Sequence, residues 1–399
     1  MISSITRKGI LSTRTLSACH YRRQLQQRWI SASQLTIERR ADDTRFDNRP
    51  AKEDLVFGTT MSDHMLTIEW DKENKWSAPK IIPYQDLKIS PAASCLHYGL
   101  ECFEGMKAYK SLNNDGSIRL FRPDMNMKRL KSSMERLHMP GADFDPQQLI
   151  DCIAELVRID QRWIPEGEGY SLYIRPTVIA THKFLGLAAP DSLLLYVITS
   201  PVGPYYKTGF KPVRLTADTK YVRAWPGGTG NAKVGGNYGP TMKAQAEAAE
   251  EGYSQVLWLW EENGEDTITE VGAMNVFFCI ADRETGETEL VTAPLDRGDI
   301  LPGVTRDSIL QLARTWDNVK VSERFATMRE VVEASEEGRL IEAFGAGTAA
   351  VVTPISCIKY HGKDIDIPAT GDMTKRIWEE VTSIQYGKKD GPPGWSIIV

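Results

Sequence analysis

The regular alternation of strand-like and helical segments most constrains the fold of this chain, and it runs from about residue 55 to the C-terminus. Ser171–Ala180 and Leu193–Ser200 are rich in β-branched and aromatic residues, which is typical of strands. Asn126–Leu137 and Pro146–Trp163 place apolar residues at helical spacing. The 399 residues of the chain exceed what one hydrophobic core usually holds. We therefore predict a mixed α/β (α+β) fold with two domains.

A turn-rich segment, Pro201–Pro212, interrupts this alternation and marks the predicted domain boundary. We predict a small N-terminal α/β domain at 48–201, an interdomain linker at 202–212 and a larger C-terminal α/β domain at 213–399. In the second domain we expect strands and helices at the following places: strands at Lys211–Ala217, Gln255–Trp260 and Thr267–Ile280, a helix at Pro240–Glu251, and a helix from the capping box Thr327–Glu330 to Gly338.

The N-terminal segment is basic, because residues 1–37 hold five arginines and Lys8, and the first acidic residue is Glu38. This segment is also rich in Ser, Thr and Gln and has no long apolar core, which favours a mitochondrial presequence over a secretory signal. We predict a transit peptide at 1–33, cleaved near Arg28–Ser33, and a mature protein in the mitochondrial matrix. A basic tail without a targeting role is the alternative.

Composition excludes several classes of protein. The net charge of −5 argues against a general nucleic-acid binder, and no apolar run approaches the roughly 18 residues that a membrane helix needs. The histidines are scattered without zinc spacing, and no G-x-S-x-G motif occurs. The cysteines form no CxxC pair and are expected to be buried thiols of a reducing compartment: Cys19, Cys95, Cys102, Cys152, Cys279 and Cys357.

One lysine, Lys233, lies in the glycine-rich stretch GGTGNAKVGGNYGPT at Gly227–Thr241. The spacing matches neither the phosphate loop G-x-x-x-x-G-K-[ST] nor the dinucleotide loop G-x-G-x-x-G. Two interpretations remain. The lysine is either solvated on a surface loop or held in a cavity that glycine backbone approaches closely.

Three further features of the second half fit one chemistry together with Lys233. Glu270 lies in the apolar strand-like segment ITEVGAMN, the segment LPGVTR at Leu301–Arg306 places backbone N–H groups where a helix begins, and GAGTA at Gly345–Ala349 can form a second anion-binding turn. A cofactor with an aldehyde, a phosphate and a ring nitrogen needs an amine, an anion site and a carboxylate. Each feature alone also fits ordinary turn chemistry, but their joint presence favours such a cofactor.

A set of motifs in fixed order then makes a resemblance specific. The chain contains HYGLECFEGMKAY, LFRPDMNMKR, LYIRP, GGNYGPT, QVLWLW, ITEVGAMN, LPGVTR and FGAGTAA. From about Val56 to Gly387 it resembles the branched-chain amino-acid aminotransferases of fold type IV, the eukaryotic mitochondrial branch in particular. The resemblance implies a two-domain fold type IV enzyme, a homodimer, and pyridoxal 5'-phosphate as cofactor. It implies small-molecule substrates, with the amino group passing between leucine, isoleucine or valine and 2-oxoglutarate.

The same resemblance assigns roles to individual residues. It makes Lys233 the catalytic, cofactor-binding lysine and Glu270 the partner of the cofactor's ring nitrogen. Further residues would contact the cofactor: Tyr238 at the ring oxygen, Arg129, Val304 and Thr305 at the phosphate, and Thr348. The substrate would meet Thr348 and Ala349 at its carboxylate, Phe57, Tyr98, Phe103, Tyr173 and Tyr238 around its side chain, Arg175 at a glutamate side chain, and Leu185 and Leu187 from across a dimer interface.

Two departures and three alternatives accompany these assignments. Relatives with a redox CxxC motif have cysteines where this chain has Ala350 and Thr353, and some have threonine where Ala273 stands. A D-amino-acid aminotransferase or an aminodeoxychorismate lyase would share the fold. A catalytically silent metabolite-binding protein would lose Lys233 or Glu270, and a nicotinamide dehydrogenase would need a dinucleotide loop. Tyr98, Phe103 and Tyr173 also fit plain core positions, and the order of preference among leucine, isoleucine and valine stays open.

Overall fold

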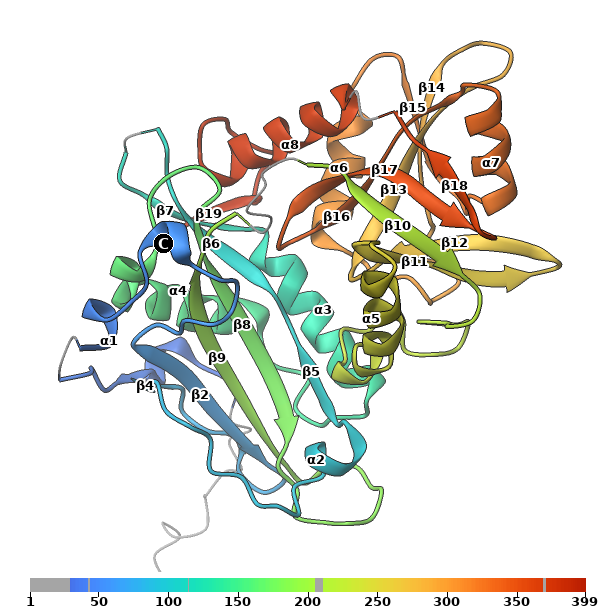
Figure 1. The fold of residues 1–399 in the computed structure, drawn as a ribbon. Coiled ribbons are helices and arrows are strands. Elements are labelled where there is room, and N and C mark those ends of the chain that lie inside the picture. Colours follow the sequence, from blue (N-terminus) through green and yellow to red (C-terminus); the bar gives the residue numbers. More distant parts are fainter. Residues whose placement is uncertain (1–28, 42–43, 114, 205–210, 369–370) are drawn as a thin grey trace, which may run out of the picture.

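A computed structural model of the chain describes residues 29–41, 44–113, 115–204, 211–368 and 371–399. Within these residues two mixed sheets form the molecule, one above the other in Figure 1. The first sheet has the strand order β1-β4-β2-β9-β8-β6-β7-β19, with β3 on β2 and β5 on β8. Its strands are β1 (Thr36–Ile37), β2 (His64–Asp71), β3 (Lys75–Trp76), β4 (Lys80–Pro83), β5 (Glu101–Phe103), β6 (Met106–Lys110), β7 (Ile118–Phe121), β8 (Ser171–Ala180), β9 (Ser192–Val202) and β19 (Ser396–Ile398).

The second sheet has the order β12-β11-β10-β17-β16-β13-β14-β15, and an additional β12–β13 pairing closes its first part into a ring. A closed ring leaves fewer unpaired strand edges. Its strands are β10 (Val213–Asp218), β11 (Gln255–Glu262), β12 (Glu265–Val271), β13 (Met274–Ala281), β14 (Thr288–Thr292), β15 (Val319–Glu323), β16 (Leu340–Gly347), β17 (Val351–Tyr360) and, paired with β17, β18 (Lys363–Asp366). The predicted mixed α/β class is confirmed.

Helices cover both sheets (Figure 1). Those that follow first-sheet strands are α1 (Thr44–Asp47), α2 (Cys95–Tyr98), α3 (Pro123–Arg136) and α4 (Pro146–Ile159), and those of the second half are α5 (Met242–Glu250), α6 (Val304–Ala313), α7 (Met328–Glu336) and α8 (Asp372–Gln385). The sequence explains why α4 forms. Asp145 caps it by accepting a hydrogen bond from the Gln147 N–H, Pro146 occupies its first turn, and its residues Leu149, Ile153 and Leu156 are fully buried.

Three predicted elements differ from those observed. The helix predicted at Pro146–Trp163 ends at Ile159. The backbone of Asp160 leaves helical geometry at φ −97° and ψ 19°, and a 3-10 turn follows at Gln161–Trp163. The Asp160 carboxylate accepts a hydrogen bond from the His64 N–H. The strand predicted at Thr267–Ile280 is a hairpin, because Gly272 turns the chain at φ +54°. The helix predicted from Pro240 begins at Met242, after a 3-10 turn.

The last strand, β19, returns to the first sheet and pairs with β7, although the sequence analysis assigned all of 213–399 to the second domain. The C-terminal segment can return because Trp395 packs on Phe121, with ring centroids 5.7 Å apart. The division at 202–212 stays a prediction, since residues 205–210 lie outside the described residues.

The described structure begins close to the predicted cleavage region. Ile30 is only 1% exposed and belongs to the core of the first sheet, and the Ala32 N–H donates to Gln148 Oε1 at 2.9 Å. Cleavage as late as Ser33 would remove this buried side chain, and the position of the boundary stays a prediction. Residues 1–28, and with them Cys19, lie outside the described residues.

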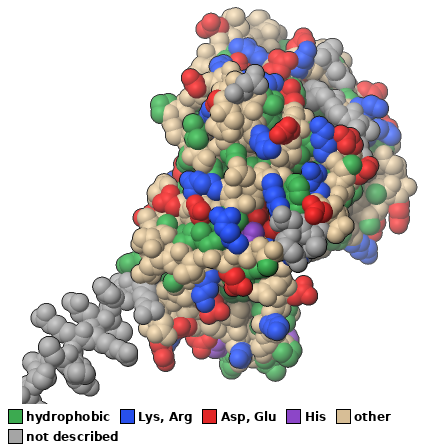
Figure 2. All heavy atoms as spheres, turned by 90° about the vertical axis from the view of Figure 1, so that its left-hand side faces the viewer, with side chains coloured by type: hydrophobic (Ala, Val, Ile, Leu, Met, Phe, Trp, Pro, Cys, Tyr) green, Lys and Arg blue, Asp and Glu red, His purple; other side chains and the backbone are tan. Residues whose placement is uncertain are grey.

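The surface mixes charges of both signs. Figure 2 shows Lys and Arg side chains interspersed with Asp and Glu on the face that carries α1 and β4. None of the helices within the described ranges combines the length and the apolar character needed to cross a bilayer. The described cysteines are free thiols, and burial raises the pKa of Cys102 and Cys279 well above the usual range.

Candidate active site

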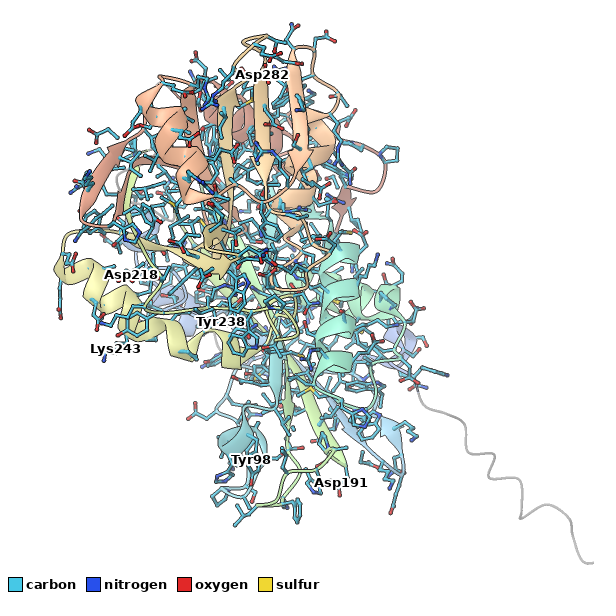
Figure 3. The ribbon with its side chains drawn as sticks, turned by 90° about the vertical axis from the view of Figure 1, so that its right-hand side faces the viewer. Tyr98, Asp191, Asp218, Tyr238, Lys243 and Asp282 are labelled. Atoms are coloured by element: carbon cyan, nitrogen blue, oxygen red, sulfur yellow. The ribbon has the colours of Figure 1, made fainter. Side chains whose placement is uncertain are left out.

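A cavity of about 620 Å³ lies between the two sheets and takes residues from both. Figure 3 shows one of them, Tyr238, between the two halves of the molecule. The predicted site residues that line this cavity are Phe57, Phe103, Arg129, Tyr173, Arg175, Lys233, Tyr238, Glu270, Val304, Thr305, Thr348 and Ala349. The fold therefore brings together segments that lie almost 300 residues apart in the chain.

Lys233 lies in a loop that is fixed at both ends. Asn237 fastens the loop, since its Nδ2 donates to the carbonyls of Thr229 and Ala232 and its Oδ1 accepts from Thr229 Oγ1 at 2.6 Å. The backbone of Lys233 forms hydrogen bonds with α3 and with β5 of the first sheet. Its N–H donates to Ser133 Oγ, and its carbonyl accepts from the Phe103 N–H. The lysine is thus held in a cavity rather than solvated on a surface loop.

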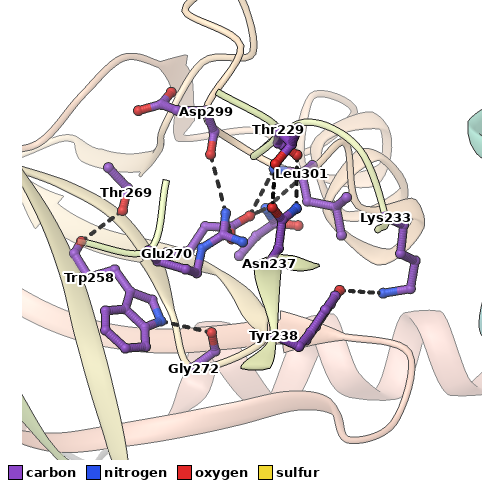
Figure 4. Close-up of polar contacts among 12 residues, drawn as sticks. Thr229, Lys233, Asn237, Tyr238, Trp258, Thr269, Glu270, Gly272, Asp299 and Leu301 are labelled. Carbon is purple, nitrogen blue, oxygen red and sulfur yellow. Dashed lines mark hydrogen bonds and ion pairs between the residues drawn. The ribbon is translucent and has the colours of Figure 1, made fainter. Parts of the chain in front are cut away.

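The Lys233 side chain points into the cavity, and its Nζ donates to Tyr238 Oη at 3.0 Å (Figure 4). The same amine lies 4.9 Å from the centroid of the Phe103 ring and 5.4 Å from that of Tyr238. Aromatic faces attract the ammonium form, and the phenol oxygen orients it. This arrangement presents one oriented amine to whatever the cavity holds.

Glu270, on β12, is 3% exposed and lies in a set of donors that the sequence analysis did not foresee. Its Oε1 accepts hydrogen bonds from Asn275 Nδ2 at 3.1 Å and from the Leu301 N–H at 2.9 Å, and its Oε2 pairs with Arg223. Burial raises the pKa of Glu270, and the Arg223 guanidinium and the Leu301 N–H oppose that rise. A carboxylate has about four acceptor positions, so one remains for a donor in the cavity.

Another part of the cavity lining contains groups that can bind anions. Val304 and Thr305 form the first turn of α6 after Gly303, and a Cβ at Gly303 would lie 2.1 Å from Asn275 Oδ1. A side chain at this position would have to displace Asn275, and the N–H groups of a helix start attract negative charge. The site therefore has a place for a phosphate at the start of α6.

Arg129, on α3, lies beside this helix start and is held by a buried carboxylate. Its Nε and Nη2 donate to the two oxygens of Glu104, each at 2.8 Å, and its Nη1 donates to the Pro302 carbonyl. Asn126 Nδ2 supports the same carboxylate at 2.8 Å. A guanidinium has five N–H donors, so two remain for an anion.

Aromatic rings and one arginine form the remaining wall. Phe57 meets Tyr173 edge to face at 4.8 Å, which leaves an apolar surface typical of a site for an aliphatic side chain. Arg175 lies over the rings of Phe103 and Tyr173, and its Nη2 donates to Tyr173 Oη at 3.2 Å. The Arg175 Nε is buried and has no partner among the described residues. This guanidinium has donors left for a ligand.

Tyr98, Leu185 and Leu187 do not line this cavity in the single chain, and their contact with the substrate stays a prediction. Tyr98 is 40% exposed and donates to the Leu185 carbonyl, so α2 and the 181–191 loop form one tip. Figure 3 shows Tyr98 at this end of the molecule, away from Tyr238. Phe103 and Tyr173, by contrast, line the cavity rather than filling a core.

The sequence analysis missed Glu104 and Arg223, which hold Arg129 and Glu270. A signal for each was present. Glu104 is one of two acids, with Glu101, in the otherwise apolar segment LECFEGM, and Arg223 precedes the glycine loop in YVRAWPGG. Charged residues are seldom fully buried unless they are paired, so an acid in an apolar segment predicts a buried ionic partner.

Comparison with known proteins agrees with this geometry. The family described as amino-transferase class IV matches residues 101–358. A branched-chain-amino-acid aminotransferase of Dictyostelium discoideum is 51% identical over 375 residues, 93% of this chain and 96% of the relative. The mitochondrial enzyme of that name from Saccharomyces cerevisiae is 49% identical, over 90% of this chain and 91% of its own length. The cytosolic enzyme of the same organism is 51% identical, over 87% of this chain and 92% of its own length.

Solved structures agree as well. A branched-chain aminotransferase from Thermoproteus uzoniensis with norvaline superposes with a TM-score of 0.66 at 26% identity, covering 84% of this chain and 99% of that one. The T.th. branched-chain amino acid aminotransferase complexed with N-(5'-phosphopyridoxyl)-L-glutamate has a TM-score of 0.64 at 27% identity, covering 83% and 97%.

The fold and the site define a class IV, fold type IV aminotransferase, whose cofactor is pyridoxal phosphate. Within this class the chain belongs to the family of branched-chain-amino-acid aminotransferases. The residues present fit the cofactor. Glu270 keeps an open acceptor position for a protonated ring nitrogen, Arg129 and the α6 N-terminus keep donors for a phosphate, and Lys233 presents its amine between them.

Proposed function

We propose that the chain transfers the amino group between leucine, isoleucine or valine and 2-oxoglutarate, giving branched 2-oxo acids and glutamate. The observation that carries this proposal is an oriented lysine amine and a buried, paired carboxylate in one cavity whose apolar wall also carries Arg175. An aliphatic side chain gains ~1.5–3 kcal/mol when such a wall buries it fully.

Pyridoxal phosphate, when bound, would supply a carbonyl for the amino group and a ring that accepts electrons from the substrate's α-carbon. Lys233 Nζ would hold the cofactor, and with an amino acid in the site this amine would take the proton from the substrate's α-carbon. Tyr238 Oη orients this amine. Glu270 would stabilise a proton on the ring nitrogen, and Arg129 with Val304 and Thr305 would retain the phosphate. Two amino acids use the site in turn, so ping-pong kinetics are expected.

The turn at Thr348 and Ala349 is the proposed site of the substrate's α-carboxylate. Both residues line the cavity between β16 and β17. Ala273 lines the same cavity and has no hydroxyl, so it makes no hydroxyl contact with the substrate. Ala350 and Thr353 have no thiols, so these two positions cannot form a redox pair of cysteines.

We further propose a homodimer in which the tip of one protomer reaches the partner. Leu185 and Leu187 are 66% and 75% exposed, beside Tyr98 and other exposed apolar residues of the same tip, Leu96 and Phe184. An exposed apolar patch of this kind marks an interaction site. Leu187→Lys should give a monomer in analytical ultracentrifugation, and an unchanged dimer would refute the role of this tip.

The proposed location is the mitochondrial matrix, with residues 1–28 as the targeting segment. The acid-free basic composition of this segment supports the proposal.

Spectra of the two half-reactions test the activity. Stopped-flow spectra of the purified holoenzyme should show loss of the lysine-bound form of the cofactor with L-leucine, and its return with 2-oxoglutarate. D-leucine should have no such effect. A response to D-leucine alone would favour a D-amino-acid aminotransferase instead.

A further inference from the structure

Behind the Thr348–Ala349 turn lies a lysine to which the mechanism above gives no role. Lys107, on β6 of the first sheet, is 6% exposed, and its Nζ donates to the Ala349 carbonyl at 2.8 Å. The bond therefore joins the first sheet to the turn between β16 and β17 of the second.

The turn itself is strained. Gly347 pairs with Val351 across it, and Val351 adopts φ +64°. A β-branched residue in the left-handed region costs about 1–3 kcal/mol and persists only where its surroundings hold it. The hydrogen bond to the Ala349 carbonyl is such a constraint, since it fixes the orientation of the peptide that follows Ala349.

The charge of Lys107 has no acidic partner among the described residues. A second cavity, of about 370 Å³, lies behind the turn, and Lys107 shares it with Tyr109, Glu168 and Tyr386. Glu168 is bound to Lys388 at 3.0 Å, and burial raises the pKa of both tyrosines, which keeps them neutral. Tyr173, opposite Lys107 on β8, is a further phenol. A buried ammonium without a counter-charge is unfavourable.

We propose that Lys107 is a positioning residue for the substrate's α-carboxylate: it fixes the 348–350 turn through the Ala349 carbonyl and supplies positive charge behind it. This inference rests on the proposed function, which brings a carboxylate to the front of the same turn. The arriving carboxylate then provides the negative charge that Lys107 lacks. Burial lowers the pKa of Lys107 to about 8, so this support should weaken as the pH rises through that value.

The test compares ligands with and without a carboxylate. Lys107→Met keeps an unbranched apolar side chain, one atom shorter, and removes the charge. The KM for L-leucine and the Kd of 4-methylpentanoate should rise about 10–100-fold, the range for loss of a charged hydrogen bond. 3-Methylbutylamine is leucine without its carboxylate. The rate of its half-reaction should change less than about 3-fold, which is the range for a substitution that removes no specific interaction.

A matched control is Lys110→Met on the same strand, where the lysine is a third exposed and pairs with Glu166. It should change neither the Kd of 4-methylpentanoate nor the rate of the half-reaction with 3-methylbutylamine. Lys107→Arg should restore 4-methylpentanoate binding and remove its weakening above pH 8. It also provides the test if Lys107→Met fails to fold.

Equal losses for leucine and for the amine would overturn the inference and make Lys107 a packing residue, and so would unchanged binding of 4-methylpentanoate. Calorimetry of 4-methylpentanoate binding needs no turnover. An inactive wild-type enzyme would therefore refute the proposed function while Lys107 is still tested.

Discussion

At the scale of single residues, two ionic groups of the cavity, Glu270 and Arg129, are each held by a buried partner of opposite charge. Arg223 pairs with Glu270, and Glu104 pairs with Arg129. Breaking a buried pair by removing one partner costs about 3–5 kcal/mol, so these partners fix the side chains that would meet the cofactor.

Glu270→Gln should retain cofactor but lose turnover. A neutral amide cannot stabilise the proton on the ring nitrogen, so kcat should fall about 10²–10³-fold, as for loss of a key electrostatic group. Cofactor absorbance after gel filtration measures retention, and steady-state assays measure turnover. Glu262→Gln, at the exposed end of β11, is the control. Unchanged turnover in Glu270→Gln would refute the role.

Arg175→Met should separate the two substrates. Only glutamate brings a second carboxylate to the apolar end of the cavity, where it would be buried without a partner once the guanidinium is lost. The glutamate half-reaction should slow about 10–100-fold while the leucine half-reaction stays near wild type. Arg158→Met, on the outer face of α4, is the control. If both half-reactions slow equally, Arg175 has a structural role.

At the scale of elements, sequence patterns predicted the segments whose character is local. Strands β8 and β9 and helices α3 and α7 lie where composition and capping residues place them, and Thr327 caps α7 by accepting from the Glu330 N–H as expected. The hairpin at Gly272 was missed although its signal is local, since Val271 pairs with Met274 across a two-residue loop that begins with glycine. A Cβ at Gly272 would also lie 1.9 Å from Gln255 Oε1, on the neighbouring strand β11.

The lysine loop gives the prediction at this scale. A Cβ at Gly230 would lie 2.3 Å from the Asp299 carbonyl oxygen, whereas nothing lies within 4 Å of one at Gly236. Gly230→Ala must therefore displace backbone and should lower both the yield of folded protein and the cofactor bound per protomer. Gly236→Ala should leave both near wild type. Similar behaviour of the two variants in an absorbance titration with pyridoxal phosphate would contradict this account of the loop.

At the scale of the whole molecule, the site exists only where the two sheets meet. Lys233 belongs to the second half of the chain, yet its backbone is bound to α3 and β5 of the first. The cofactor and most site residues could be assigned from motifs. The placement of Tyr98 could not be predicted, because the sequence does not show whether an exposed loop contributes to the cavity of its own chain or to that of a partner.

The N-terminal boundary gives the prediction at this scale. A protein that begins at Trp29 should be as stable as the full chain, whereas one that begins at Gln34 loses Ile30 and should unfold about 1.5–3 kcal/mol more easily in urea. In intact cells, the full chain fused to a fluorescent protein should enter mitochondria and the Trp29 form should stay in the cytosol. Import of the Trp29 form would contradict a targeting role for residues 1–28.

Reductive trapping of the cofactor tests the central claim most directly, since that claim places one reactive amine at Lys233. Borohydride treatment of the holoenzyme, followed by peptide mapping, should leave the pyridoxyl mass on the peptide that contains Lys233. Lys243 is the next lysine along the chain. It lies on α5, its side chain is 74% exposed, and it points outward in Figure 3. A pyridoxyl group found on Lys243 instead would contradict the account.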